Sequence, residues 1–194
     1  MANEMAAKVH PVVLAGGSGT RLWPISTPSR PKHLLEMVGS ETMLEQTLER
    51  VSHPGLFGPA TVIGAAAEAG QVAALAPGVR LVLEPMPRGS AAAVALAAWA
   101  ANPDDVLLIL PSDHHISDPE PLYDAIGQAL PAAEAGNLIT FGIRPAQAET
   151  GYGYIIGGEE IGPGVLKAQS FVEKPAKDVA EQLLSTVRTL FDNN

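Results

Sequence analysis

A glycine-rich turn followed by isolated cations is the chemically most informative stretch of the sequence. Residues 16–19 read Gly-Gly-Ser-Gly, and such residues let backbone N–H groups approach a ligand closely. Arg21 and Lys32 come next, in a loop whose prolines prevent a long helix. Residues 5–35 carry four Lys or Arg and no Asp or Glu, so a segment of charge +4 lies in a chain of net charge −9. This pattern favours a polyphosphate site held by backbone amides and cationic side chains.

Two familiar phosphate loops are excluded by spacing. The sequence contains no Gly-x-x-x-x-Gly-Lys-Ser/Thr string, and Leu22 occupies the place of the third glycine of a dinucleotide fingerprint. For the glycines alone, an ordinary turn beside a solvated basic loop is an equal alternative. The added Arg21 and Lys32 favour the phosphate site.

A carboxylate directly after an apolar run is the second candidate. Asp113 follows the run at 106–110, and its oxygens suit Mg²⁺, which takes hard oxygen ligands together with phosphate oxygens. The alternative is a turn-capping role before His115. His114 and His115 do not indicate zinc, because adjacent residues of an extended segment point to opposite sides and the chain has no cysteine.

Alternating strands and helices must position these residues. Apolar runs predict strands at 10–15, 60–64, 79–83, 106–110 and 138–143, and helical patterns predict helices at 41–52, 66–76, 90–101 and 119–135. Thr42 and Glu45 match a capping box, and Ser90 is expected to cap a helix that is apolar on nearly every face and therefore buried. The alternation predicts an α/β fold, Rossmann-like, with a mostly parallel central sheet between two helical layers. We expect one domain, residues 1–194. Ligands of such sheets bind at the carboxyl ends of the strands, which is where the candidate residues lie.

Five motifs in order resemble the sugar-1-phosphate nucleotidylyltransferases. They are GGSGTRLWP with RPKHLL, EP with PRGSAAAVALAA, LPSDH, ETGYGYI and FVEKP. Trp23 and the RPKHLL form resemble the mannose-1-phosphate guanylyltransferase (GDP-mannose pyrophosphorylase) branch in particular. The implied reaction joins GTP and α-D-mannose 1-phosphate to give GDP-mannose, a precursor for polysaccharide biosynthesis, and pyrophosphate. Mg²⁺ is the implied cofactor.

The resemblance also implies roles for individual residues. The implied catalytic residues are Arg21, Lys32 and Asp113, with Asp113 as the metal ligand. The implied nucleotide-binding residues are Ala15, Gly16, Gly17, Ser18, Gly19, Thr20, Arg21, Lys32, Glu84, Pro85, Ser90 and Asp113. The implied sugar-phosphate-binding residues are Tyr152, Gly153, Glu173 and Lys174.

The sequence departs from the family pattern at two places. Gly89 and Ser90 stand where the family usually has Asn and Thr, so an amide is missing and weaker base selection is expected. After FVEKP the family continues to a W-N-S-G-type motif and a second metal carboxylate, which are absent here, so we expect a domain that is incomplete at its C-terminal end. The alternatives are a transferase for glucose 1-phosphate with dTTP or UTP, and a non-catalytic GTP-binding fragment.

Composition narrows the class of protein. The 194 residues are 46% hydrophobic and 17% charged, which is enough to fold around a core. The absence of cysteine fits a cytoplasmic protein, and no apolar stretch approaches the roughly 20 residues that span a membrane. The net charge of −9 argues against nucleic acid or a membrane as partner. The expected partners are GTP and mannose 1-phosphate, and self-association into a homo-oligomer is left open.

Overall fold

The computed structural model describes residues 9–16, 22–27, 29–86, 88–186 and 188–192. The chain divides into two compact units, residues 1–119 and 120–194, and each is described by itself. The expectation of one nucleotidyltransferase domain stays a prediction.

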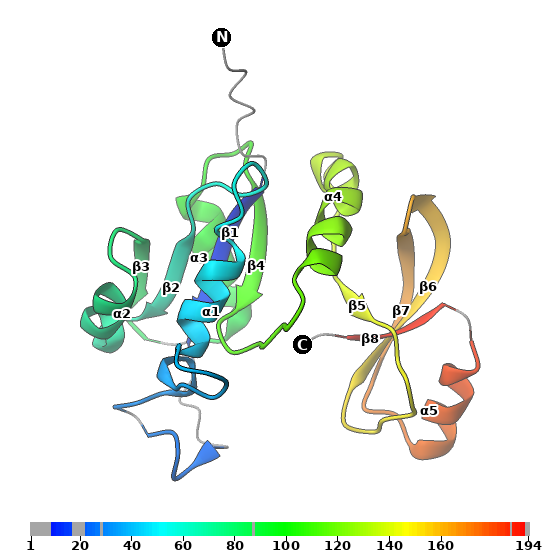
Figure 1. Ribbon diagram of the computed structural model, residues 1–194. Coiled ribbons are helices and arrows are strands. Elements are labelled where there is room, and N and C mark those ends of the chain that lie inside the picture. The colour runs from blue at the N-terminus through cyan, green and yellow to red at the C-terminus, as the bar shows by residue number, and fades with distance from the viewer. Residues whose placement is uncertain (1–8, 17–21, 28, 87, 187, 193–194) are drawn as a thin grey trace. The chain divides into compact units, whose positions relative to one another are not determined.

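A fully parallel sheet of four strands forms the centre of the first unit (Figure 1). Its strands are β1 (Val9–Ala15), β2 (Thr61–Ala65), β3 (Arg80–Glu84) and β4 (Val106–Pro111), in the order β3-β2-β1-β4. The central strand β1 is buried along most of its length, because helices cover both faces of the sheet. The apolar, β-branched runs of the sequence therefore predicted the right kind of sheet.

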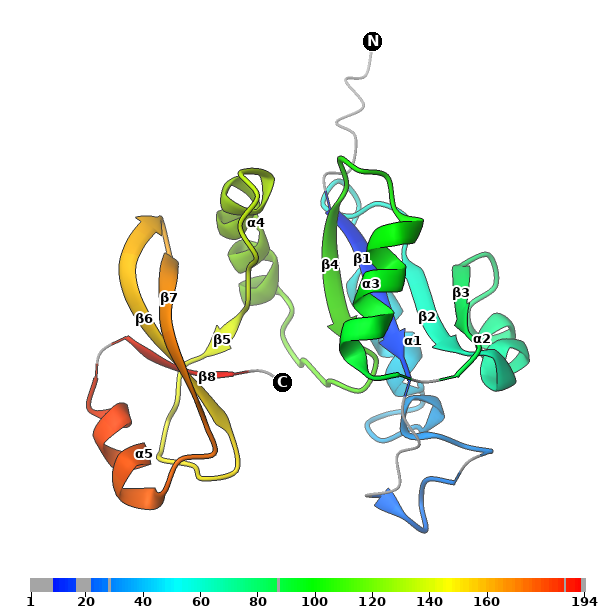
Figure 2. The same ribbon diagram turned by 180° about the vertical axis from the view of Figure 1, so that it is seen from behind.

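The helices of the first unit are η2 (Lys32–Leu34), α1 (Met43–Arg50), η3 (Ala66–Glu68), α2 (Ala69–Leu75) and α3 (Ser90–Ala100). Figures 1 and 2 show α1 and α3 on opposite faces of the sheet. The capping box at the start of α1 is confirmed, since Thr42 accepts from the backbone of Glu45 and the Glu45 side chain accepts from Thr42. On the other face, Val12 and Ile63 pack with Ala93 of α3 in a core cluster.

Two expectations about α3 are wrong. Only Ala93 and Ala97 of this helix are buried, and Trp99 is 84% exposed, so an apolar composition on every side did not bring burial on every side. Alanine is small and tolerates exposure, which makes an alanine-rich helix a poor indicator of its own surroundings. Ser90 makes no capping hydrogen bond, because the N-cap position belongs to Gly89 and Ser90 is the first helical residue.

The second unit contains a different, antiparallel sheet. Its elements are α4 (Glu120–Glu134), β5 (Gly142–Ile143), β6 (Gly153–Gly162), β7 (Val165–Glu173), α5 (Lys177–Leu184) and β8 (Thr189–Asp192). The strand order is β5-β8-β6-β7, and β6 and β7 form a long hairpin. The predicted strand at 138–143 is wrong in length, since only Gly142 and Ile143 find a partner, the short strand β8. Among the described residues, none of the helices combines the length and apolar character that crossing a bilayer requires.

Candidate active site

Three loops of the first unit emerge at one edge of its sheet. In the strand register Ala65 pairs with Glu84, so β2 and β3 end level with each other. On the other side of β1, the backbone N–H of Ser112 donates to the carbonyl oxygen of Leu14 at 3.2 Å. Gly16 begins the turn after β1, between these two loops. The described ends of these strands therefore lie at one edge of the sheet, which is where Gly16, Glu84 and Ser112 are found.

Glu84 is the last residue of β3, at this edge of the sheet. It is buried to 9% exposure, and a Cβ atom built on Gly16 would lie 3.8 Å from Glu84 Oε2. The carboxylate therefore lies directly beside the first glycine of the turn, which puts its acceptor oxygens next to the predicted nucleotide site.

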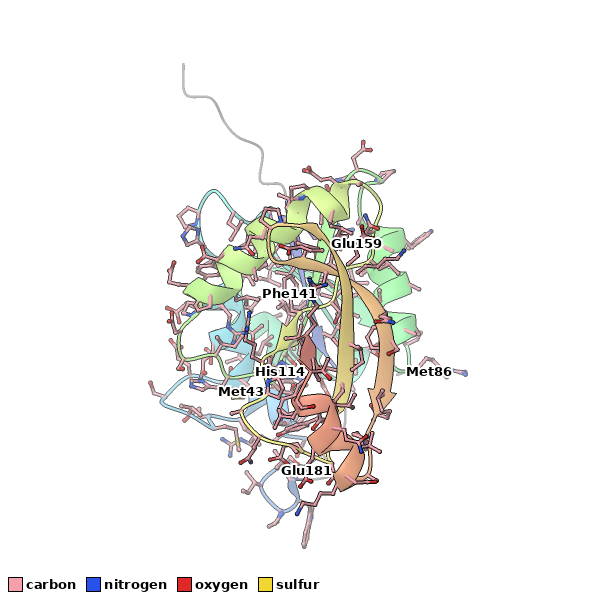
Figure 3. All side chains as sticks on the ribbon, turned by 90° about the vertical axis from the view of Figure 1, so that its right-hand side faces the viewer. Met43, Met86, His114, Phe141, Glu159 and Glu181 are labelled. Carbon is pink, nitrogen blue, oxygen red and sulfur yellow. The ribbon has the colours of Figure 1, made fainter. Side chains whose placement is uncertain are left out.

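An open hollow of about 400 Å³ adjoins Glu84. Its lining residues are Glu84, Pro85, Met86, Arg88, Ala92 and Leu96. Apolar surfaces from a loop and from α3 thus surround two charged groups, a combination typical of sites for flat heterocyclic ligands. Met86 (Figure 3) is 54% exposed, and its sulfur accepts from Arg88 Nε at 3.2 Å, so these two lining side chains contact each other.

Lys32 and Asp113 form an ion pair. Lys32 Nζ donates to Asp113 Oδ2 at 2.8 Å, although 81 residues separate the two in the chain. Both side chains are about one-third exposed, at 34% and 36%, so water and a ligand can reach them. The sequence singled out both residues, and the structure brings them together.

The carboxylate of Asp113 could provide one ligand to Mg²⁺ if phosphates and water provided the others. Within the described ranges, no cluster of three or more histidine or acidic side chains could hold a metal ion by itself. Mg²⁺ commonly uses one or two carboxylates and takes its other ligands from phosphates and water. One Asp113 oxygen accepts from Lys32, and the other oxygen can serve as a ligand.

Two histidines flank the ion pair, and sequence reasoning assigned neither a role. His33 Nε2 lies 3.1 Å from Glu68 Oε2, without the alignment of a hydrogen bond. Burial lowers the pKa of His33, against the raising effect of Asp113, and burial raises the pKa of Glu68. Burial also lowers the pKa of His114; Asp113 opposes this shift, and the nearby cations Lys32 and Arg50 add to it. The surroundings of the ion pair thus favour neutral imidazoles.

Arg50 is a further residue that sequence reasoning missed. Its guanidinium is buried and donates from Nη2 to the carbonyl oxygen of His114 at 2.7 Å. The two residues are 64 positions apart, so the local pattern of the sequence gives no signal for this contact.

Several predicted nucleotide-binding residues lie outside the described residues. They are Gly17, Ser18, Gly19, Thr20 and Arg21, whose roles stay predictions. Of the others, Ala15 is buried at the end of β1, and Pro85 lines the hollow. Ser90 is exposed at the start of α3.

The predicted sugar-phosphate residues meet in the second unit. The N–H of Lys174 donates to the carbonyl oxygen of Tyr152 at 3.2 Å, and Lys174 Nζ lies 2.5 Å from Glu173 Oε1. Gly153 pairs with Glu173 across β6 and β7. Among the described residues, Lys174 is the non-glycine residue with a positive φ, 42°, a conformation that often marks functional sites. Tyr152 is 54% exposed and packs edge-on against Phe191.

Gly153 lies close to two acidic side chains. A Cβ atom at this position would lie 2.9 Å from Glu173 Oε2 and 3.2 Å from Asp192 Cβ. Asp192 therefore joins the group, although sequence reasoning did not include it. Asp192 belongs to β8, and β8 pairs with β6 although the two strands are far apart in the sequence.

Comparison with known proteins identifies the family of the chain. The family model described as nucleotidyl transferase matches residues 10–194. The chain belongs to this family. This nucleotidyl transferase chain is 44% identical, over 95% of its length, to a mannose-1-phosphate guanylyltransferase of Sinorhizobium fredii. It is 39% identical, over 90% of its length, to the alginate biosynthesis protein AlgA of Pseudomonas aeruginosa. In both cases it spans 38% of the relative's own length.

A solved structure shows the same fold. The crystal structure of a Thermus thermophilus protein, described as a mannose-1-phosphate geranyltransferase, superposes with a TM-score of 0.84 at 36% identity. The match covers 95% of this nucleotidyl transferase chain and 55% of the other chain. The α/β class predicted from the sequence is thereby confirmed.

Proposed function

We propose that this nucleotidyl transferase chain carries the site that transfers a guanylyl group from GTP to α-D-mannose 1-phosphate. A phosphate oxygen of the sugar phosphate attacks the α-phosphorus of GTP, and the bond from that phosphorus to the oxygen bridging to the β-phosphorus breaks. Pyrophosphate leaves, and GDP-mannose is the other product. The observation that carries the proposal is the ion pair of Lys32 with Asp113, whose neighbour Ser112 is hydrogen-bonded to Leu14 near the carboxyl end of β1.

Lys32 stabilises charge on the phosphates. Phosphoryl and nucleotidyl transfers leave little covalent work to the protein, so positioning and electrostatic stabilisation supply the rate. Lys32 already lies at the sheet edge with its ammonium 2.8 Å from a carboxylate oxygen. Because this pair is partly exposed and weak, the ammonium can exchange its partner for a phosphate oxygen. We assign Arg21 the same kind of role on the leaving group.

Asp113 would hold Mg²⁺ together with phosphate oxygens of GTP. When bound there, the ion neutralises negative charge on the phosphates and orients the transferring group. Asp113 keeps Lys32 in place in the absence of nucleotide and contributes an oxygen ligand in its presence.

The hollow beside Glu84 is the proposed base site. The carboxylate of Glu84 can accept from the paired N–H donors of guanine or from ribose hydroxyls. Met86 and Leu96 offer apolar surface to the face of the ring. The name of one relative, mannose-1-phosphate guanylyltransferase, supports this choice of nucleotide. The same name supports mannose 1-phosphate, and not glucose 1-phosphate, as the proposed sugar substrate.

Mannose 1-phosphate is assigned to the open end of the β6–β7 hairpin, where Gly153 pairs with Glu173. Glu173 can accept hydrogen bonds from sugar hydroxyls, and Lys174 can meet the phosphate as a point charge. Gly153 lets the backbone come close to the pyranose, and Tyr152 offers an exposed ring. We further propose a cytoplasmic location, which the absence of cysteine supports. Self-association into a homo-oligomer stays an expectation, and light scattering would measure it.

The experiment incubates the chain with GTP, mannose 1-phosphate and Mg²⁺ and measures GDP-mannose by chromatography. Parallel reactions replace GTP with ATP, UTP or dTTP, and mannose 1-phosphate with glucose 1-phosphate. We expect product from the GTP and mannose 1-phosphate pair, dependent on Mg²⁺ and strongly reduced, but still measurable, in Asp113→Asn. A folded chain that makes no GDP-mannose, or makes as much product from UTP and glucose 1-phosphate, would contradict the proposal.

A further inference from the structure

Helix α1 is bonded to both segments that carry the ion pair. At its beginning, the backbone N–H of Met43 donates to the carbonyl oxygen of Leu35 at 3.1 Å. Leu35 in turn closes η2, since its N–H donates to the carbonyl oxygen of Lys32 at 3.1 Å. One end of α1 is therefore two hydrogen bonds away from the lysine of the proposed site.

The other half of α1 holds the segment after Asp113. Arg50 Nη2 donates to the carbonyl oxygen of His114 at 2.7 Å, and His115 Nδ1 lies 3.1 Å from Gln46 Oε1. Gln46 and Arg50 are four residues apart, so they lie on one face of the helix. Two side chains of α1 thus hold two successive residues immediately beyond the metal-ligand candidate.

The helix itself is firmly anchored. Its capping box fixes the N-terminus, and Leu44 and Thr47 are completely buried against the sheet. Gln46 is also restrained, because its Nε2 donates to the carbonyl oxygens of Val38 at 2.6 Å and Glu41 at 3.1 Å. The contacts to His114 and His115 therefore come from a rigid element.

The choice of arginine matters for the more buried contact. Arg50 is 7% exposed, and burying a cation is costly unless its donors are satisfied. A planar guanidinium fixes direction as well as distance, whereas a lysine ammonium is a flexible point charge. A buried arginine that donates to the carbonyl oxygen of His114 therefore suits a backbone segment whose position must be fixed.

We propose that Arg50 is a positioning residue, which sets the place of Asp113 relative to Lys32 by holding the carbonyl group of His114. Gln46 supports it through His115. The inference deepens the proposed function and rests on it for its consequence in catalysis. Its geometrical part, that Arg50 determines the conformation of residues 113–115, concerns the chain without substrate.

The test compares Arg50→Lys with a second arginine variant, Arg80→Lys. Arg80 also donates from Nη2 to a backbone carbonyl oxygen, that of Ala100 at 2.8 Å, but it is exposed and begins β3, at the opposite edge of the sheet from the strand ends. We expect Arg50→Lys to lower kcat for GDP-mannose formation roughly 10- to 100-fold, the scale of a misplaced catalytic group, and Arg80→Lys to leave it unchanged. We also expect Arg50→Lys to raise the Mg²⁺ concentration needed for half-maximal rate.

A double-mutant cycle separates positioning from general stabilisation. If Arg50 acts through Asp113, then Arg50→Lys should have little further effect in an Asp113→Asn background, because coupled residues are not additive. Independent, multiplicative losses would overturn the proposal. Gln46→Ala, at an exposed hydrogen bond, provides a variant that keeps the fold and should show a smaller loss of the same kind.

A substrate-free readout distinguishes the failure of this inference from the failure of the proposed function. In NMR spectra of the chain alone, the amide signals of residues 113–115 should move in Arg50→Lys and not in Arg80→Lys. Unchanged signals would overturn the positioning role even in an active enzyme. Changed signals in a chain that makes no GDP-mannose would refute the proposed function and leave the positioning intact.

Discussion

Lys32→Ala separates the catalytic importance of the ion pair from its contribution to stability. The side chains of Lys32 and Asp113 are 34% and 36% exposed, and ion pairs that water reaches contribute about 1 kcal/mol or less to folding. The loss of a cation that stabilises the transition state costs roughly 10²–10³ in turnover. We therefore expect a large fall in kcat together with an almost unchanged free energy of unfolding. Lys32→Arg should restore the rate only in part, because a fork replaces a point charge.

The assay measures initial rates of GDP-mannose formation at saturating substrates, with urea unfolding followed by circular dichroism. Lys177→Ala is a matched control, since Lys177 is an exposed lysine of α5 that lies 3.8 Å from Glu181. The control should change neither rate nor stability. Near-normal turnover in Lys32→Ala would refute the placement of Lys32 in the site. An equal fall in both variants would show that the loss is not specific.

Three further predictions concern Gly89 at the start of α3, the buried His33, and Gly153 in the proposed sugar site. Gly89 has φ 85° and ψ 170°, a conformation that is essentially restricted to glycine, so Gly89→Asn should lower the free energy of unfolding by about 1–3 kcal/mol. Ser90→Ala, which removes no cap, should change it by less than about 0.5 kcal/mol, and equal effects in urea unfolding would contradict this. Burial lowers the pKa of His33 from its ordinary 6.5, so on acidification the unfolded chain takes up the proton first, and stability should fall as the pH drops through about 6.5. His33→Gln should lose less stability than the wild type between pH 7.5 and 6; Glu68, whose pKa is raised, contributes with the opposite sign as the pH falls further. Gly153→Ala should displace the Glu173 carboxylate and raise KM for mannose 1-phosphate several-fold, with KM for GTP unchanged, and the reverse pattern would argue against a sugar site there.

Much of the first unit could be predicted because its signals are local. Apolar strands such as β4, the capping box of Thr42 and Glu45, and the glycine turn are all written in short segments. A parallel sheet also brings the ends of its strands together, so residues that follow separate strands predict one site. For this reason the loops after β1, β3 and β4 could be expected at one edge, whereas the contact of Lys32 with Asp113 came from the structure.

The remainder depends on contacts that no short segment encodes. Arg50 reaches His114 across 64 positions, and β8 completes a sheet with strands far earlier in the chain. Trp99 is exposed for the same reason: the composition of a helix does not show which other elements pack against it. At Gly89, the sequence showed a missing amide, but only the backbone showed why glycine suits the position.

The fate of an isotopic label at the α-phosphorus of GTP tests the central claim most directly. If the site transfers a guanylyl group, the label must appear in GDP-mannose, while a label at the β-phosphorus must appear in pyrophosphate. The formation of both labelled products should require Mg²⁺, and both rates should fall by the same factor in Lys32→Ala and in Asp113→Asn. Label from the β-phosphorus recovered in GDP, with inorganic phosphate as the other product, would mean that a different bond breaks and would contradict the account.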